Sequence, residues 1–180
     1  NWQAFRVKQD IGARSSVGLI ATFKEPDPGL SDKLVLPVPR YASSDFNRVF
    51  AVDATIASRA TQHEVQFVAG RSFTDSLSAG GEEMVWYGAQ RWRNSWMNYQ
   101  VAYSDIGDNF IAQSGFIPQT DIRTLNGSLE FSPLVRRYGV RSVNSSMNAN
   151  YTVDREDKIT NPERWSVNED LFFELEGGVW

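Results

Sequence analysis

Apolar and polar residues alternate along most of this chain, in segments separated by turn-forming or proline-containing stretches. A repeat of two residues predicts β-strands, because successive side chains of a strand point to opposite faces of a sheet. We expect nine strands, at roughly residues 2–9, 15–24, 46–58, 63–73, 83–92, 95–104, 121–131, 138–153 and 164–175. The pattern therefore predicts an all-β protein, folded as an antiparallel up-and-down meander.

The alternation differs in strength between segments. It is clearest in 138–153, where Val143, Met147 and Tyr151 share one face and Asn144 and Asn148 lie on the other. The segment 83–92 is apolar on both faces, and 164–175 carries an acidic residue at position 169 on its otherwise apolar face. The face opposite the apolar one is rich in Asn, Ser, Thr, Gln and Gly, which suits the wall of a hydrated lumen.

The links between these strands alternate strictly between short and long. Residues 10–14, 59–62, 93–94 and 132–137 form short links, and residues 25–45, 74–82, 105–120 and 154–163 form long ones. Short turns then lie at one end of the sheet and long loops at the other, which is typical of bacterial outer-membrane β-barrels. We therefore expect part of a transmembrane β-barrel, with the short links on the periplasmic side and the long links outside the cell.

Strand length and aromatic placement favour the same class. Most of the strands have about the 9–11 residues that a tilted strand needs to cross the hydrocarbon layer. Aromatic residues near strand ends are candidates for the girdles at the two membrane–water interfaces. These candidates are Phe23, Phe46, Phe73, Trp92, Trp96, Tyr103 and Trp165. The alternative is that they are ordinary core residues of a soluble sheet.

Composition and charge exclude several classes of protein and of chemistry. Mean hydropathy is −0.40 and no run approaches the length of a spanning helix, which excludes a membrane protein built of such helices. Net charge is −4 with scattered Lys and Arg, so we expect no nucleic-acid partner, and the absence of cysteine excludes thiol chemistry. The number of expected strands is odd, and the sequence both begins and ends in a strand-like pattern. These two features predict that residues 1–180 form a single barrel segment of a longer chain.

One long link carries an oxygen-rich motif. Its candidate residues are Asp105, Gly107, Asp108, Asn109 and Phe110, followed by Gly115, Phe116 and Pro118. The acids could hold calcium, but they lack the spacing of an EF-hand loop, and Asx-type turn chemistry explains the same residues. We therefore expect no metal and no cofactor.

Catalytic chemistry has little support in the sequence. His63 is the sole histidine, without a serine, cysteine or metal partner in view. The acid pairs Glu82/Glu83 and Asp53/Glu64 would need a defined separation across a sugar to act as a glycosidase. We expect no catalytic residues.

Three stretches together resemble a known group of proteins. They are Arg6 to Gly18 (RVKQDIGARSSVG), Asn47 to Ala54 (NRVFAVDA) and Tyr103 to Phe110 (YSDIGDNF), the last continuing to GFIP at 115–118 and DIR at 121–123. In this order, over roughly residues 5–135, they resemble an uncharacterised bacterial barrel family whose members usually follow a domain similar to family 9 carbohydrate-binding modules. The resemblance implies an outer-membrane barrel and supplies no catalytic residues.

The leading hypothesis is a component of a Gram-negative outer membrane, acting as a pore, transporter or surface anchor without catalysis of its own. Its expected partners are the lipid bilayer, other outer-membrane or periplasmic subunits, and polysaccharide. A second hypothesis is a soluble all-β carbohydrate-binding module whose exposed tryptophans stack on sugar rings. A third is a glycan hydrolase that uses loop carboxylates such as Asp105 and Asp108.

Overall fold

The computed structural model describes residues 2–25, 46–58, 62–74, 83–112, 119–155 and 164–175, and all of their regular structure is β-strand. The strands are β1 (Trp2–Asp10), β2 (Ser16–Lys24), β3 (Asn47–Ala57), β4 (His63–Thr74), β5 (Met84–Arg93), β6 (Met97–Ile106), β7 (Ile122–Phe131), β8 (Leu134–Arg137), β9 (Val140–Asp154) and β10 (Arg164–Leu175). No helix of the described part is long and apolar enough to span a membrane.

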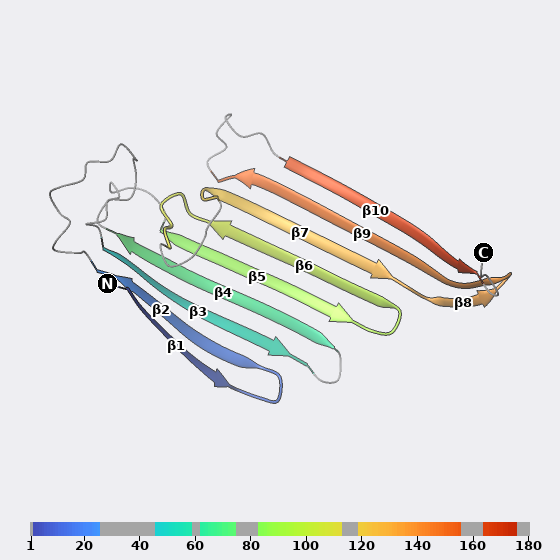
Figure 1. The fold of residues 1–180 in the computed structure, drawn as a ribbon, viewed down its shortest axis with the longest axis horizontal. Coiled ribbons are helices and arrows are strands. Elements are labelled where there is room, and N and C mark those ends of the chain that lie inside the picture. Colours follow the sequence, from blue (N-terminus) through green and yellow to red (C-terminus); the bar gives the residue numbers. More distant parts are fainter. Residues whose placement is uncertain are drawn as a thin grey trace.

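All ten strands belong to one antiparallel sheet, in which each main strand pairs with the next in the chain (Figure 1). The order is β1-β2-β3-β4-β5-β6-β7-β9-β10, with β8 paired to β9 off this path. The predicted all-β meander is thus confirmed, and the nine predicted strands agree with the observed bounds to within two residues.

The tenth strand corrects one predicted link. Residues 132–137 were expected to form a short turn, but Leu134–Arg137 form β8, which pairs with the beginning of β9. The turn itself is formed by Tyr138 and Gly139, whose φ angles of 55° and 75° are both positive. Two positive φ angles match the two-residue turn that suits the twist of a hairpin. The fourth hairpin therefore reaches beyond the others.

The hairpins are staggered across the sheet. Ser16, the last paired residue of the first hairpin, lies opposite Thr55, and β3 continues two residues further to Ala57. Glu64 lies opposite Arg91, and β5 again continues two residues further. Two residues are about 6.8 Å along a strand and two strands are about 9.6 Å across the sheet, so the turns of the first three hairpins follow a line tilted by about 35°. Figure 1 shows the resulting slanted outline of the sheet.

Register assigns the side chains of the main strands to one of two faces, and a few charged residues, among them Arg71, Asp105 and Glu169, lie on the otherwise apolar one. The apolar face carries Phe5, Val7, Val17, Leu19, Phe23, Phe50, Val52, Ile56, Val65, Phe67, Phe73, Met84, Trp86, Trp92, Met97, Tyr99, Val101, Tyr103, Leu125, Leu129, Phe131, Val143, Met147, Tyr151, Val153, Trp165, Val167, Leu171 and Phe173. The polar face carries Arg6, Lys8, Asn47, Asp53, Glu64, Gln66, Ser72, Arg91, Asn98, Gln100, Ser104, Thr124, Asn126, Ser128, Asn144, Asn148, Asn150, Thr152, Ser166 and Asn168.

The apolar face is largely uncovered. Phe5, Leu19 and Val167 are 58%, 59% and 56% exposed, and large apolar side chains are exposed on every main strand of the sheet. Among the described residues, the only buried hydrophobic ones are Val49, Ala102 and Phe110. A soluble sheet normally buries its apolar face against a second layer of structure. The described part of this chain supplies no such layer.

Candidate functional site

A segment that follows β6 folds over the polar face at the long-loop end of the sheet. The backbone N–H of Ile111 donates to Ser72 Oγ at 3.0 Å, and Asn47 Nδ2 donates to the carbonyl oxygen of Ile111 at 2.9 Å. The Ser72 hydroxyl also lies 3.5 Å from the carbonyl oxygen of Asn109. Residues 107–112, which we call the docked segment, are thus attached to β3 and β4, two strands that lie before β6 in the sheet.

Burial shows how closely the docked segment fits. Asn47 is 1% exposed, Ser72 is 0% exposed and Phe110 is 5% exposed. These values are unusual for a chain that leaves most of its apolar side chains open. Buried polar groups need hydrogen-bond partners, and the backbone of the segment supplies them for both side chains. The small polar residues of β3 and β4 therefore specify where the segment lies.

The oxygen-rich motif of residues 105–110 is divided between β6, which contains Asp105, and the docked segment, which contains residues 107–110. Gly107 continues the ladder by donating its N–H to the carbonyl oxygen of Met84 at 2.8 Å. Asp108 and Asn109 occupy a turn, closed by the N–H of Phe110 donating to the carbonyl oxygen of Gly107 at 3.3 Å. These four residues belong to the docked segment. Gly115, Phe116 and Pro118 lie outside the described residues.

Asp105, expected in the same link, instead lies in β6 on the side of the apolar face. Its carboxylate oxygens lie 3.2 Å from Arg123 Nε and 2.8 Å from Arg155 Nε, and the Tyr103 hydroxyl donates to it at 3.3 Å. Asp105 and Arg155 are each only 14% exposed at the side chain. Asp105 therefore joins β6, β7 and the residue after β9.

Aromatic rings form a continuous row on the apolar face at the long-loop end. The ring centroids of Phe5 and Phe23 are 6.0 Å apart, those of Phe23 and Phe50 are 5.5 Å apart, and those of Phe50 and Phe73 are 6.0 Å apart, all edge to face. Such pairs stabilise each other beyond their buried area. Phe23 and Phe73 were predicted girdle residues, whereas Phe5 and Phe50 were not among them.

Two arginines lie beside aromatic rings at the same end of the sheet. The Arg48 guanidinium is 5.1 Å from the ring centroid of Phe46, another predicted girdle residue, and pairs with Glu25 at 3.0 Å. The Arg71 guanidinium is 4.9 Å from the ring centroid of Phe73. Charge and aromatic rings thus meet at the edge of the apolar face.

A second aromatic group lies near the short turns. The ring centroids of Trp92 and Tyr99 are 5.9 Å apart, and those of Trp96 and Phe131 are 5.5 Å apart. Along β4, Phe73 and His63 mark the two ends of the apolar face. Ten residues of strand at a tilt of about 35° correspond to about 27 Å of height, close to the apolar band of about 25 Å in membrane barrels.

The last two girdle candidates lie further along the sheet. Tyr103 on β6 and Trp165 on β10 both lie in register with Tyr151, on one cross-strand row of the apolar face. Trp165 is 75% exposed. All seven predicted aromatics therefore lie on the apolar face or at its ends, but not in one straight line.

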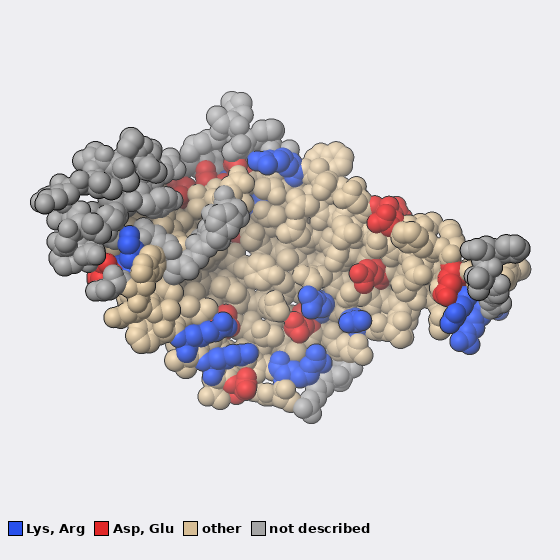
Figure 2. Space-filling view, in the orientation of Figure 1, with Lys and Arg blue, Asp and Glu red and all other residues tan. Residues whose placement is uncertain are grey.

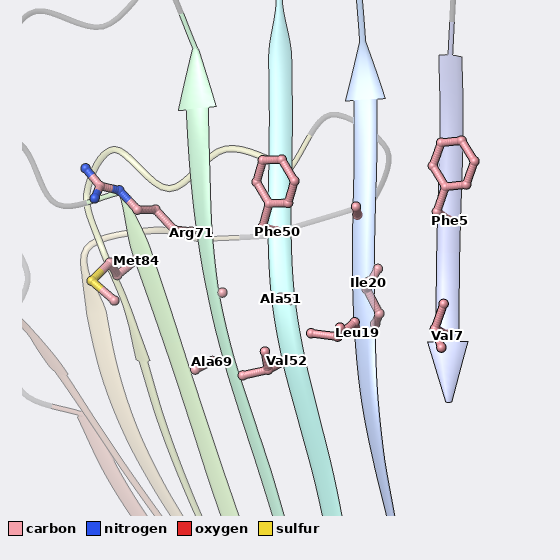
Figure 3. Close-up of a pocket in the computed structure, with 12 residues that line it drawn as sticks. Phe5, Val7, Leu19, Ile20, Phe50, Ala51, Val52, Ala69, Arg71 and Met84 are labelled. Atoms are coloured by element: carbon pink, nitrogen blue, oxygen red, sulfur yellow. The ribbon is translucent and has the colours of Figure 1, made fainter. Parts of the chain in front are cut away.

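Between the aromatic groups, the apolar face contains shallow troughs, one of which is drawn in Figure 3. One of them has a volume of about 440 Å³ and is bordered by Phe5, Val7, Leu19, Phe50, Val52 and Met84. Small residues at positions 21, 51, 69 and 70 also line it, and Arg71 lies at one end of it. The trough is an open apolar surface and contains little that could hold a polar ligand.

The acidic residues and the histidine that the sequence singled out do not form one cluster, and each described one contacts a different partner. Asp53 pairs with Arg6 at 3.4 Å, Glu64 accepts from the Gln66 amide at 2.9 Å, and His63 lies beside Trp92. Glu83 pairs with Arg71 at 3.4 Å, and Glu82 lies outside the described residues. The described ranges contain no group of three or more His, Cys, Asp or Glu that could hold a metal ion.

Comparison with family models, with curated proteins and with solved structures found no match for this chain. The resemblance to a bacterial barrel family therefore stays a prediction. The class that the fold itself defines is an all-β protein with one sheet of sequentially paired antiparallel strands. Its particular features are an uncovered apolar face and a segment docked on the polar face.

Proposed function

We propose that this chain is part of a bacterial outer-membrane β-barrel and acts as a pore, transporter or surface anchor without catalysis of its own. The observation that carries the proposal is the apolar face, which is exposed on every main strand while only three hydrophobic residues of the described part are buried. Lipid chains would cover such a face and remove it from water. The open trough of about 440 Å³ in this face would suit acyl chains (Figure 3).

Three further features support the same proposal. The stagger of the hairpins corresponds to a strand tilt of about 35°, within the range for membrane barrels. Aromatic groups border the apolar face near both ends of β4, and the Arg71 guanidinium lies against the Phe73 ring at the long-loop end. The polar face would then line the lumen, and the docked segment would narrow that lumen at the extracellular end.

The soluble carbohydrate-binding alternative is less well supported. Trp96 and Trp165 are 44% and 75% exposed, as sugar-stacking residues would be. However, they lie within a broad apolar face, beside Phe131 and in register with Tyr151. Sugar-binding platforms need polar groups around the rings to bind hydroxyls, and this face has few. For the hydrolase alternative, Asp105 is already held by two arginines.

Fractionation of the full-length protein tests the proposal. We expect the protein to sediment with the outer membrane, to resist extraction by salt and alkaline carbonate, and to dissolve only in detergent. A cytoplasmic or periplasmic protein of similar size, followed in the same cells, provides the control for incomplete lysis. Recovery of the folded protein in detergent-free aqueous buffer would count against the proposal and favour the soluble module.

A further inference from the structure

The polar face is divided into a charged half and a half that is neutral in its middle, which we call the neutral half. Glu130 and Asp170 lie in the row that borders this neutral region. Over β1–β5 it carries cations and acids, among them Arg6, Lys8, Asp53, Glu64 and Arg91. Over the middle of β6, β7, β9 and β10 it carries amides, hydroxyls and small residues. Figure 2 shows charged side chains gathered over β1–β5, an uncharged region beside them, and acidic side chains beyond that region.

The neutral half contains a trough of about 240 Å³. Its lining residues are Gln100, Ala102, Asn126, Gly127, Ser128, Asn148, Ala149, Asn150, Ser166 and Asn168, none of which is charged. Register arranges the polar ones in two rows across four strands, one of Gln100, Ser128, Asn148 and Asn168 and one of Asn126, Asn150 and Ser166. Neighbours within a row are about 4.8 Å apart, and the rows are about 6.7 Å apart.

Much of the hydrogen-bonding capacity in these rows is unused. Asn150 donates to Asn126, and Gln100 accepts from Arg91 at 2.8 Å. In contrast, the side chains of Asn148 and Asn168 are exposed and make no hydrogen bond within the described part of the chain. Each amide offers two donors and one acceptor oxygen. The trough therefore presents an ordered set of neutral donors and acceptors to a solute.

We propose that these two rows, the amide track, bind neutral polyhydroxylated solutes such as short saccharides during their passage along the polar face. A sugar hydroxyl both donates and accepts, so it complements an amide or hydroxyl on the track. Ions gain no Coulomb attraction from uncharged groups. The trough also lacks an aromatic ring, so binding is weak and release is fast, as passage requires. This inference rests on the proposed barrel function, because the track needs a lumen.

Permeation of the full-length protein in lipid vesicles tests the inference. The probes are maltotriose, followed by vesicle swelling, and potassium chloride, followed by single-channel conductance. Loss of two neutral hydrogen-bonding groups in the Asn148→Leu/Asn168→Leu double variant is expected to slow maltotriose entry by at least about fivefold. Conductance in potassium chloride should stay within about twofold, because ions do not use the amides.

Two further variants complete the experiment. Gln66→Leu changes a polar-face amide in the charged half and should leave both readouts unchanged. Asn148→Val/Asn168→Val removes the amides with a residue that suits strands, and it should slow maltotriose entry as the leucine variant does. Equal maltotriose entry in wild type and in both double variants, with normal conductance, overturns the amide track alone. A wild-type protein that neither conducts nor admits maltotriose overturns the barrel proposal and the track with it.

Discussion

The substitution Phe67→Arg is expected to lower the free energy of unfolding in lipid vesicles by about 2–4 kcal/mol, the cost of placing arginine near the middle of a lipid-facing strand. Phe67 lies on the apolar face of β4, roughly midway between Phe73 and His63, and is 41% exposed. In cells, the same variant should accumulate poorly in the outer membrane. Urea unfolding of the vesicle-bound protein measures the change.

The neighbouring residue supplies a matched control. Gln66→Arg introduces the same charge one position away on the polar face, where Gln66 already donates to Glu64, so we expect a change within about 0.5 kcal/mol. Phe67→Leu separates the loss of the ring beside Trp86 from the effect of the charge. Equal destabilisation by the two arginine variants would contradict the assignment of the faces.

Removal of the hydrogen-bonding side chains beneath the docked segment is expected to release it. In the Asn47→Leu/Ser72→Val double variant, the N–H and carbonyl of Ile111 lose the partners that now bind them. Each unsatisfied buried group costs about 1–3 kcal/mol, so the segment should leave the polar face. Two measurements report this change: single-channel conductance should rise, and limited proteolysis should cleave between residues 107 and 120.

Ser104→Val is the control for this prediction. Ser104 lies on the polar face of β6 and makes no hydrogen bond to the docked segment among the described residues. Its replacement changes the same type of side chain and should leave conductance and cleavage as they are in the wild type. If the double variant conducts and resists protease as the wild type does, the docked segment does not narrow the lumen.

Much of the fold could be predicted because the strands are regular. In the segment 138–153 the period of two is strict from Met147 to Val153, and the observed β9 covers Val140–Asp154. The one missed strand, β8, has only four residues and follows Pro133, which normally indicates a break. Its hairpin turn also uses Tyr138 at a positive φ, where the favoured residues are Asn, Asp and Gly. Neither feature leaves a usable signal in the sequence.

The candidate site could be predicted only in part. The motif around residues 105–110 was visible in the sequence and stays a candidate, but its division between β6 and the docked segment depends on partners that lie far away in sequence. Asn47 and Ser72 are small polar residues in alternating strands, and nothing local distinguishes them from their exposed neighbours. A usable signal lies in Phe110 and Ile111, adjacent apolar residues of the link whose burial would require contact with the sheet.

Solvent accessibility along β9 tests the central claim most directly, namely that lipid covers the apolar face. The chain contains no cysteine, so a cysteine introduced at each position from 143 to 152 can carry a single spin label. In the full-length protein in lipid vesicles, we predict that odd positions collide with oxygen dissolved in the bilayer and even positions with a water-soluble nickel complex. Odd positions that are closed to both reagents, as in a protein core, or open to the nickel complex would contradict the account.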